Sequence, residues 1–167
     1  MTGLDAFVGQ REIASPADME AFGRVLGEAL DAGDLVVLTG PLGAGKTTLT
    51  RGIAAGLGVR GPVQSPTFVI ARTHPSLVGG PALLHVDAYR LGAAAELDDL
   101  DLDLDHSVTI VEWGRGMVDG LADSWWEIEL DREWSGVGID TACGTGGRAA
   151  REMEDNAPRL VTVTRRP

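Results

Sequence analysis

The feature of this chain that most restricts its fold is the glycine-rich segment GPLGAGKT, which spans Gly40 to Thr47. It matches the pattern G-x-x-x-x-G-K-S/T of a phosphate-binding loop, in which backbone amides surround the phosphates of a nucleotide. An apolar run at 35–38 precedes the loop and predicts a buried strand, and the apolar spacing at 48–57 predicts a helix after it. Strand, loop and helix in this order predict an α/β sheet of the P-loop class.

The loop residues divide into phosphate contacts and a metal contact. Lys46 is the only lysine of the chain, whereas the other thirteen basic residues are arginines. A compact ammonium group suits this position better than a bulkier planar guanidinium group. We expect Lys46 to contact the β- and γ-phosphates of ATP and the Thr47 hydroxyl to bind Mg²⁺. The predicted nucleotide contacts also include Leu42, Gly43, Ala44, Gly45 and Thr48.

Composition predicts a single P-loop domain over residues 1–167. The chain is 44% hydrophobic, which is enough for one globular core at this length. A formal net charge of −11 argues against direct binding of RNA or DNA. We find no secretory signal and no apolar run near the roughly 20 residues that span a bilayer, so we expect a cytoplasmic protein without a membrane anchor. The single Cys143 cannot form an internal disulfide.

Two later apolar runs, at 82–87 and 108–112, each end in a carboxylate. In an open α/β sheet, ligands bind beyond the carboxyl ends of the parallel strands. Asp87 and Glu112 should therefore lie beside the phosphate-binding loop. There they could bind Mg²⁺ directly or through water, or orient the water that attacks the γ-phosphate.

The remaining pattern predicts one further helix and several strands. Ser15 and Pro16 predict the start of a helix that continues over 17–31 and ends before Gly33. Strands are predicted at 67–71, 125–130 and 159–164, with a turn at 73–81 after the first of them. The predicted fold is a mixed, mainly parallel P-loop sheet flanked by helices, with antiparallel edge strands. The residues expected on the inner face of the first helix are Met19, Phe22, Val25, Leu26 and Leu30.

Two charged regions leave alternatives open. The segment ELDDLDLDLD at 96–105 suits a short strand or the start of a helix, and its acids form either a solvated face or a docking surface for a basic partner. Basic residues gather late in the chain, where they could serve a nucleotide, a partner or solubility; they are Arg148, Arg151, Arg159, Arg165 and Arg166.

Three classes of P-loop protein can be compared. A typical GTPase is excluded, because it reads guanine with N-K-x-D and the only lysine lies in the loop. A kinase for a small metabolite remains open, although its arginine-rich lid has only a weak counterpart at 147–151. A nucleotide-gated binding module without useful hydrolysis is the third possibility.

Four segments together resemble the bacterial TsaE family. They are GPLGAGKTT at 40–48, SPTF at 65–68, HVDAYR at 85–90 and VEW at 111–113, and a late GRAAR at 147–151 extends the likeness. The resemblance covers roughly residues 10 to 155 in order and spacing. One departure is Gly114, where the family often has proline.

The resemblance implies a small ATPase that joins the TsaD and TsaB proteins. Its hydrolysis of ATP supports the attachment of a threonylcarbamoyl group to N6 of adenosine 37 in tRNAs that read codons beginning with A. The chain would meet tRNA only through that complex, and its hydrolysis alone is expected to be weak.

The resemblance also implies roles for single residues. Lys46 and Thr47 match the phosphate and Mg²⁺ contacts, Asp87 the second acidic motif, and Glu112 a Mg²⁺-associated glutamate. Thr67 falls in a switch-like segment that senses the γ-phosphate. Arg148 matches an arginine close to the nucleotide, and the Ser15 region lies near the adenine.

Overall fold

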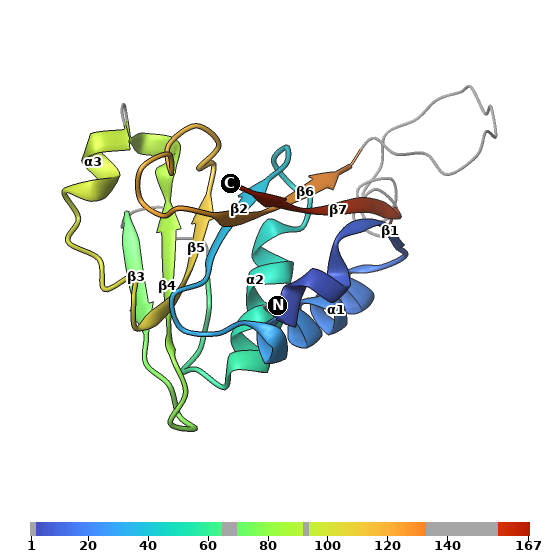
Figure 1. Ribbon diagram of the computed structural model, residues 1–167. Helices are drawn as coiled ribbons and strands as arrows, with labels where there is room; N and C mark the ends of the chain where they lie inside the picture. Colours follow the sequence, from blue (N-terminus) through green and yellow to red (C-terminus); the bar gives the residue numbers. More distant parts are fainter. Residues whose placement is uncertain (1–2, 65–69, 92–93, 133–156) are drawn as a thin grey trace.

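The computed structural model describes residues 3–64, 70–91, 94–132 and 157–167, which form one seven-stranded sheet with helices beside it (Figure 1). The strands are β1 (Gly9–Ile13), β2 (Leu35–Thr39), β3 (Ala71–His74), β4 (Ala82–Asp87), β5 (Ser107–Glu112), β6 (Trp125–Asp131) and β7 (Arg159–Arg166). The helices are α1 (Pro16–Ala29), α2 (Lys46–Leu57) and α3 (Ala94–Asp98), and two 3₁₀ turns are η1 (Gly3–Phe7) and η2 (Ala88–Arg90).

The strand order is β1-β7-β6-β2-β5-β4-β3. The four central strands, β6, β2, β5 and β4, are mutually parallel. The flanking strands β7, β1 and β3 pair antiparallel with their neighbours. The predicted fold class, a mixed sheet with antiparallel edges, is confirmed.

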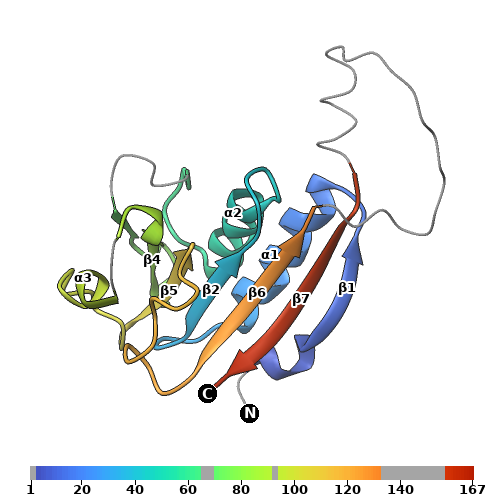
Figure 2. The same ribbon diagram turned by 90° about the horizontal axis from the view of Figure 1, so that it is seen from above.

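Helices α1 and α2 lie together on one face of the sheet (Figure 2). Apolar side chains from both helices and from six strands form the larger core there. The two helices approach closely because each presents a pair of glycines to the other: Gly23 and Gly27 on α1, and Gly52 and Gly56 on α2. A Cβ atom at any of the four would overlap a backbone carbonyl oxygen of the facing helix.

The opposite face carries a smaller core over β2, β4 and β5. Leu97 of α3, at 1% exposure, and Val118 of the segment between β5 and β6 are buried in it. In the acidic segment the leucines Leu100 and Leu102 pack against this core, whereas the neighbouring aspartates are exposed. The structure therefore shows a short helix followed by an irregular stretch whose acids face solvent.

Several predicted boundaries differ from the structure. Helix α1 ends at Ala29, and Val25, which we expected on the inner face, is 47% exposed because it lies beside the buried stripe of Met19, Gly23 and Leu26. The strand predicted at 67–71 overlaps β3 only at Ala71, and residues 67–69 lie outside the described part of the chain. The turn predicted at 73–81 begins later, because β3 continues to His74. Strand β1 was not predicted.

Among the described residues, none of the helices has the length and apolar character needed to cross a membrane.

Candidate nucleotide-binding site

The phosphate-binding loop connects β2 to the first turn of α2. Gly43 and Gly45 have φ angles of 77° and 104°, which favour glycine over residues with a Cβ atom. Gly45 is the N-cap of α2 and provides no side-chain cap, so the amides of the first helical turn are left for a ligand. This end of a helix also carries a partial positive charge. The loop is therefore built to receive an anion.

Lys46 lies almost buried inside the loop, at 7% exposure. Its Nζ donates hydrogen bonds to the carbonyl oxygens of Gly40 at 2.7 Å and Pro41 at 3.0 Å. The ring of Trp113 covers the same amine, with Nζ 4.3 Å from the ring centroid. Burial lowers the pKa of Lys46, and the charges of Glu112 and Asp87 partly offset that effect.

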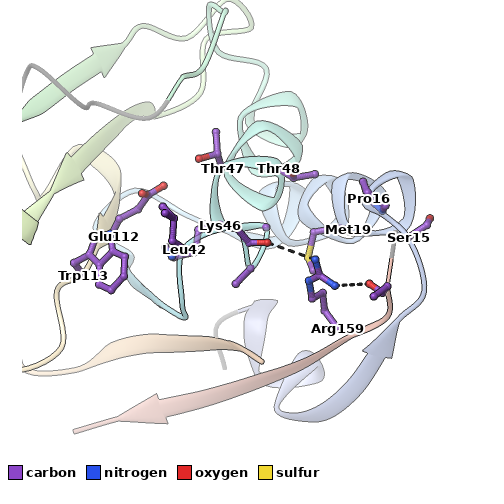
Figure 3. A pocket seen from close by; sticks show the side chains of 14 residues that line it. Ser15, Pro16, Met19, Leu42, Lys46, Thr47, Thr48, Glu112, Trp113 and Arg159 are labelled. Atoms are coloured by element: carbon purple, nitrogen blue, oxygen red, sulfur yellow. Dashed lines mark hydrogen bonds between the residues drawn. The ribbon is translucent and has the colours of Figure 1, made fainter. Parts of the chain in front are cut away.

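A cavity of about 570 Å³ opens beside this loop (Figure 3). Most of the predicted site residues line it together: Ser15, Leu42, Gly43, Ala44, Gly45, Lys46, Thr47, Thr48 and Glu112. Ser15 is the N-cap of α1 and accepts a hydrogen bond from the amide of Asp18, so the start of α1 forms the far wall. Thr67 and Arg148 lie outside the described residues.

The two predicted carboxylates are direct neighbours, since Asp87 and Glu112 pair in the parallel register of β4 and β5. Their surroundings differ. Glu112 is 2% exposed, lines the cavity and accepts a hydrogen bond from His85 Nε2 at 3.1 Å. Asp87 is more exposed, is not part of the cavity wall, and accepts a hydrogen bond from the amide of Tyr89 at the start of η2.

Sequence reasoning had not assigned five residues of this wall to the site, and two of them, Arg159 and Trp113, make specific contacts with the loop. Arg159, at 6% exposure, donates from Nη1 to the carbonyl oxygen of Ala157 at 2.6 Å and from Nη2 to that of Gly43 at 3.4 Å. The sequence placed Arg159 among the late arginines without a defined role. Trp113 has a left-handed φ of 60°, which is rare for a bulky residue and turns its ring over Lys46.

The oxygen ligands that the cavity offers suit Mg²⁺ bound together with a nucleotide better than a metal ion bound by protein side chains alone. The described residues contain no group of three or more His, Cys, Asp or Glu that could hold a metal ion. Mg²⁺ at nucleotide sites takes one or two protein oxygens and completes its shell with phosphates and water. Thr47, with a hydroxyl group, and Glu112, with a carboxylate, are both lining residues of the cavity and fit that pattern.

Comparison with known proteins identifies the family. A sequence model described as "Threonylcarbamoyl adenosine biosynthesis protein TsaE" matches residues 13–137. The chain belongs to the TsaE family. The tRNA threonylcarbamoyladenosine biosynthesis protein TsaE of Streptomyces coelicolor is 61% identical over 117 residues, covering 68% of this chain and 79% of that protein. Its counterpart in Mycobacterium leprae is 51% identical over 134 residues, covering 74% of this chain and 83% of that protein.

The fold also agrees with that of a protein whose crystal structure is known. The crystal structure of YdiB from Bacillus subtilis superimposes with a TM-score of 0.63 at 28% identity, covering 92% of this chain and 82% of that one. The family resemblance expected from the four segments is thereby confirmed, and with it a place in the biosynthesis of threonylcarbamoyladenosine in tRNA.

Proposed function

We propose that the chain is a Mg²⁺-dependent ATPase that supports threonylcarbamoylation of N6 of adenosine 37 in tRNAs reading codons that begin with A. In this proposal it acts on a complex of the TsaD and TsaB proteins, and it does not transfer the threonylcarbamoyl group itself. The observation that carries the proposal is the gathering of Lys46, Thr47 and Glu112 on one wall of the 570 Å³ cavity, at the open N-terminus of α2.

Each of these groups has a role in the proposed hydrolysis. The Lys46 amine exchanges the carbonyl oxygens of Gly40 and Pro41 for the β- and γ-phosphate oxygens. The amides of the loop stabilise the charge that develops on the departing phosphate. Thr47 and Glu112, with Asp87 nearby, would hold Mg²⁺, which would supply positive charge to neutralise the phosphates. The start of α1 at Ser15 and the guanidinium of Arg159 form the wall available to the nucleoside.

The exposed apolar side chains around the cavity support the proposal that hydrolysis depends on a partner. Leu42 is 83% exposed, Tyr89 72% and Trp113 37%, so three of the large exposed apolar side chains lie around or next to the site. A site open to water lacks the full electrostatic organisation that fast phosphoryl transfer requires. We expect TsaD and TsaB to complete it. The net charge of −11 agrees with contact to tRNA only through that complex. The proposed location of the complex is the cytoplasm.

The test is steady-state ATP hydrolysis by the purified chain, alone and with TsaD and TsaB, beside Lys46→Ala. We expect partner-stimulated and Mg²⁺-dependent hydrolysis that the variant lacks. A Lys46→Ala chain with unchanged turnover and nucleotide affinity would contradict the proposal.

The other two functional classes give different results in the same assay. Equal rates with and without partners, together with ADP production that requires an added metabolite, would indicate a kinase. ATP-dependent assembly with TsaD and TsaB that survives a Glu112→Ala change which blocks hydrolysis would indicate a nucleotide-gated binding module.

A further inference from the structure

His85 is a buried polar residue that takes no part in the proposed hydrolysis as described above. It lies in the middle of β4 with 0% exposure. Its Nε2 lies 3.1 Å from Oε1 of Glu112, and its Nδ1 has no hydrogen-bond partner among the described residues. Within the described chain, therefore, the hydrogen bond of this ring is directed to Glu112.

The strand register explains why the two side chains meet. His85 pairs with Ile110 of β5, and Asp87, two residues on, pairs with Glu112. Alternate residues of a strand share one face, so His85 and Glu112 both project toward the face that carries α2. Leu83 and Ile110, on that same face, belong to the core beneath α1 and α2. The surrounding core therefore restricts the orientation of the ring, in addition to its hydrogen bond with the carboxylate.

The chemistry of the pair decides which nitrogen carries the proton. A carboxylate accepts hydrogen bonds, so the ring must donate from Nε2–H. In the neutral ring Nδ1 is then an acceptor without a proton, which leaves no buried N–H unpaired. His85 therefore holds one oxygen of Glu112, a residue that lines the cavity beside the phosphate-binding loop.

We propose that His85 is a positioning residue for the metal site: its Nε2–H fixes the orientation in which Glu112 receives Mg²⁺. The inference rests on the proposed function, because it takes Glu112 as the Mg²⁺-associated carboxylate. Hydrogen-bonding partners behind metal-ligating carboxylates usually change metal affinity or activity about 10- to 100-fold when removed. His85 does not itself touch the nucleotide.

Two substitutions separate positioning from packing. His85→Leu keeps an apolar side chain of similar size and removes the donor, whereas His85→Gln keeps an N–H near the place of Nε2. The matched control is His74→Leu, because His74 is also a buried strand histidine, at 7% exposure, but bonds to the carbonyl oxygen of Arg60. Each variant is assayed with TsaD and TsaB for the Mg²⁺ concentration that half-saturates ATP hydrolysis. Binding of a non-hydrolysable ATP analogue is measured with and without Mg²⁺.

We expect His85→Leu to raise the half-saturating Mg²⁺ concentration about tenfold. Analogue binding without Mg²⁺ should change less than about twofold, since the donor acts through the metal site. His85→Gln should recover most of the loss, and His74→Leu should leave the Mg²⁺ titration unchanged. In a Glu112→Ala background, His85→Leu should not weaken Mg²⁺-dependent analogue binding any further. An unchanged Mg²⁺ titration in His85→Leu would overturn the inference. It would also be overturned if His85→Leu weakened Mg²⁺-dependent analogue binding as much in the Glu112→Ala background as in the wild type.

A measurement on the unaltered chain keeps the test independent of folding. The chain has three histidines, so ¹⁵N–¹H correlation spectra of the imidazole rings can be assigned with the two His→Leu variants or, if one does not fold, with His85→Gln. We expect the Nε2–H tautomer at His85, and the Nδ1–H tautomer would overturn the inference. If wild-type chain with its partners shows no Mg²⁺-dependent ATP binding or hydrolysis, the proposed function fails instead. An active wild type with an unaffected His85→Leu variant rejects the positioning role alone.

Discussion

At the scale of single residues, Asp87 and Glu112 show how far two similar acids can differ. The sequence gives both the same position, at the end of an apolar strand. The structure pairs them across β4 and β5, but only Glu112 is buried and lines the cavity, whereas Asp87 caps η2. A buried carboxylate with one fixed oxygen is better organised to bind a cation than a partly exposed one that already accepts a hydrogen bond from a backbone amide.

This difference predicts unequal effects on Mg²⁺. Glu112→Gln should raise the Mg²⁺ concentration that half-saturates ATP hydrolysis by about tenfold or more, and Asp87→Asn by less. Nucleotide binding measured without Mg²⁺ should change little in either variant. The two titrations, run side by side with TsaD and TsaB present, compare the acids directly. A larger shift in Asp87→Asn than in Glu112→Gln would indicate that Asp87, and not Glu112, contacts the metal directly.

Lys46 gives a second prediction at this scale. Its amine fits between two loop carbonyls and the Trp113 ring at 7% exposure, which leaves no room for the wider guanidinium fork. We expect Lys46→Arg to weaken ATP binding at least about tenfold, which corresponds to about 1.4 kcal/mol. Arg24→Lys, the reverse exchange at an exposed position of α1, serves as control and should not change it. Calorimetric titration with ATP measures both, and full binding by Lys46→Arg would contradict the steric argument.

At the scale of elements, the contact between α1 and α2 determines where the P-loop helix lies. The four glycines at this contact allow backbone to meet backbone, so each helix fixes the position of the other. Because Lys46 begins α2 and Ser15 caps α1, the same contact sets the distance between the two walls of the cavity. Helix packing and site geometry are therefore coupled.

The coupling predicts the effect of a single added methyl group. Gly27→Ala would raise intrinsic helix propensity by about 1 kcal/mol, but its Cβ would overlap the carbonyl oxygen of Ile53. We expect a net loss of about 1–3 kcal/mol in the free energy of unfolding, measured by urea denaturation. Gly80→Ala is the control, because the nearest atom to its added Cβ is 3.8 Å away. Equal stability of wild type and Gly27→Ala would mean that the helices can separate without cost.

Sequence patterns predicted the central elements well and the edges poorly, for a physical reason. The runs at 35–38, 82–87 and 108–112 are apolar because their strands are covered on both faces, so composition alone indicates them. Strand β1, with sequence GQREI, has one buried residue and exists through its backbone pairing with β7. That pairing joins segments about 150 residues apart, and no local pattern reports it.

The same limit applies to the site. The phosphate-binding loop and the two acids follow from local motifs and from one rule about strand ends. Arg159 reaches the cavity only because β7 lies next to β6, and His85 meets Glu112 only through the register of β4 with β5. Strand order and register are properties of the whole sheet, so neither contact could be predicted from a segment.

At the scale of the whole molecule, an ion-pair network connects the segment before β6 with the sheet and the C-terminal strand. Glu127 of β6, at 6% exposure, accepts hydrogen bonds from Arg115 Nε and Arg166 Nε, each at 2.6 Å. Burial acts to raise the pKa of Glu127, but these two bonds outweigh it and hold the pKa below its usual value. Glu129 of the same strand also bonds to Arg115, from a more exposed position.

A lowered carboxylate pKa makes global stability depend on pH with a defined sign. The contribution of Glu127 is complete above the ordinary glutamate value of 4.5 and is lost as the pH falls through the lower folded-state value. We expect Glu127→Gln to reduce the free energy of unfolding by about 1 kcal/mol near neutral pH, since both arginines are half-exposed and partly screened. The deficit should shrink below about pH 4. Urea denaturation across this range tests it, with Glu129→Gln as the milder control; a deficit that grows in acid would contradict the assignment.

The strand order has a consequence for how such a chain is assembled during synthesis. Strand β7, the last in chain order, lies between β6 and β1, and β1 pairs with β7 alone in the described sheet. A ribosome releases β1 well before β7, yet in the described sheet the backbone groups of β1 have no strand partner until β7 has emerged. The parallel centre formed by β4, β5, β2 and β6 can assemble earlier, with the P-loop already in place. The wall of the cavity beside the phosphate-binding loop is completed last, because Arg159 arrives on the strand that completes the sheet.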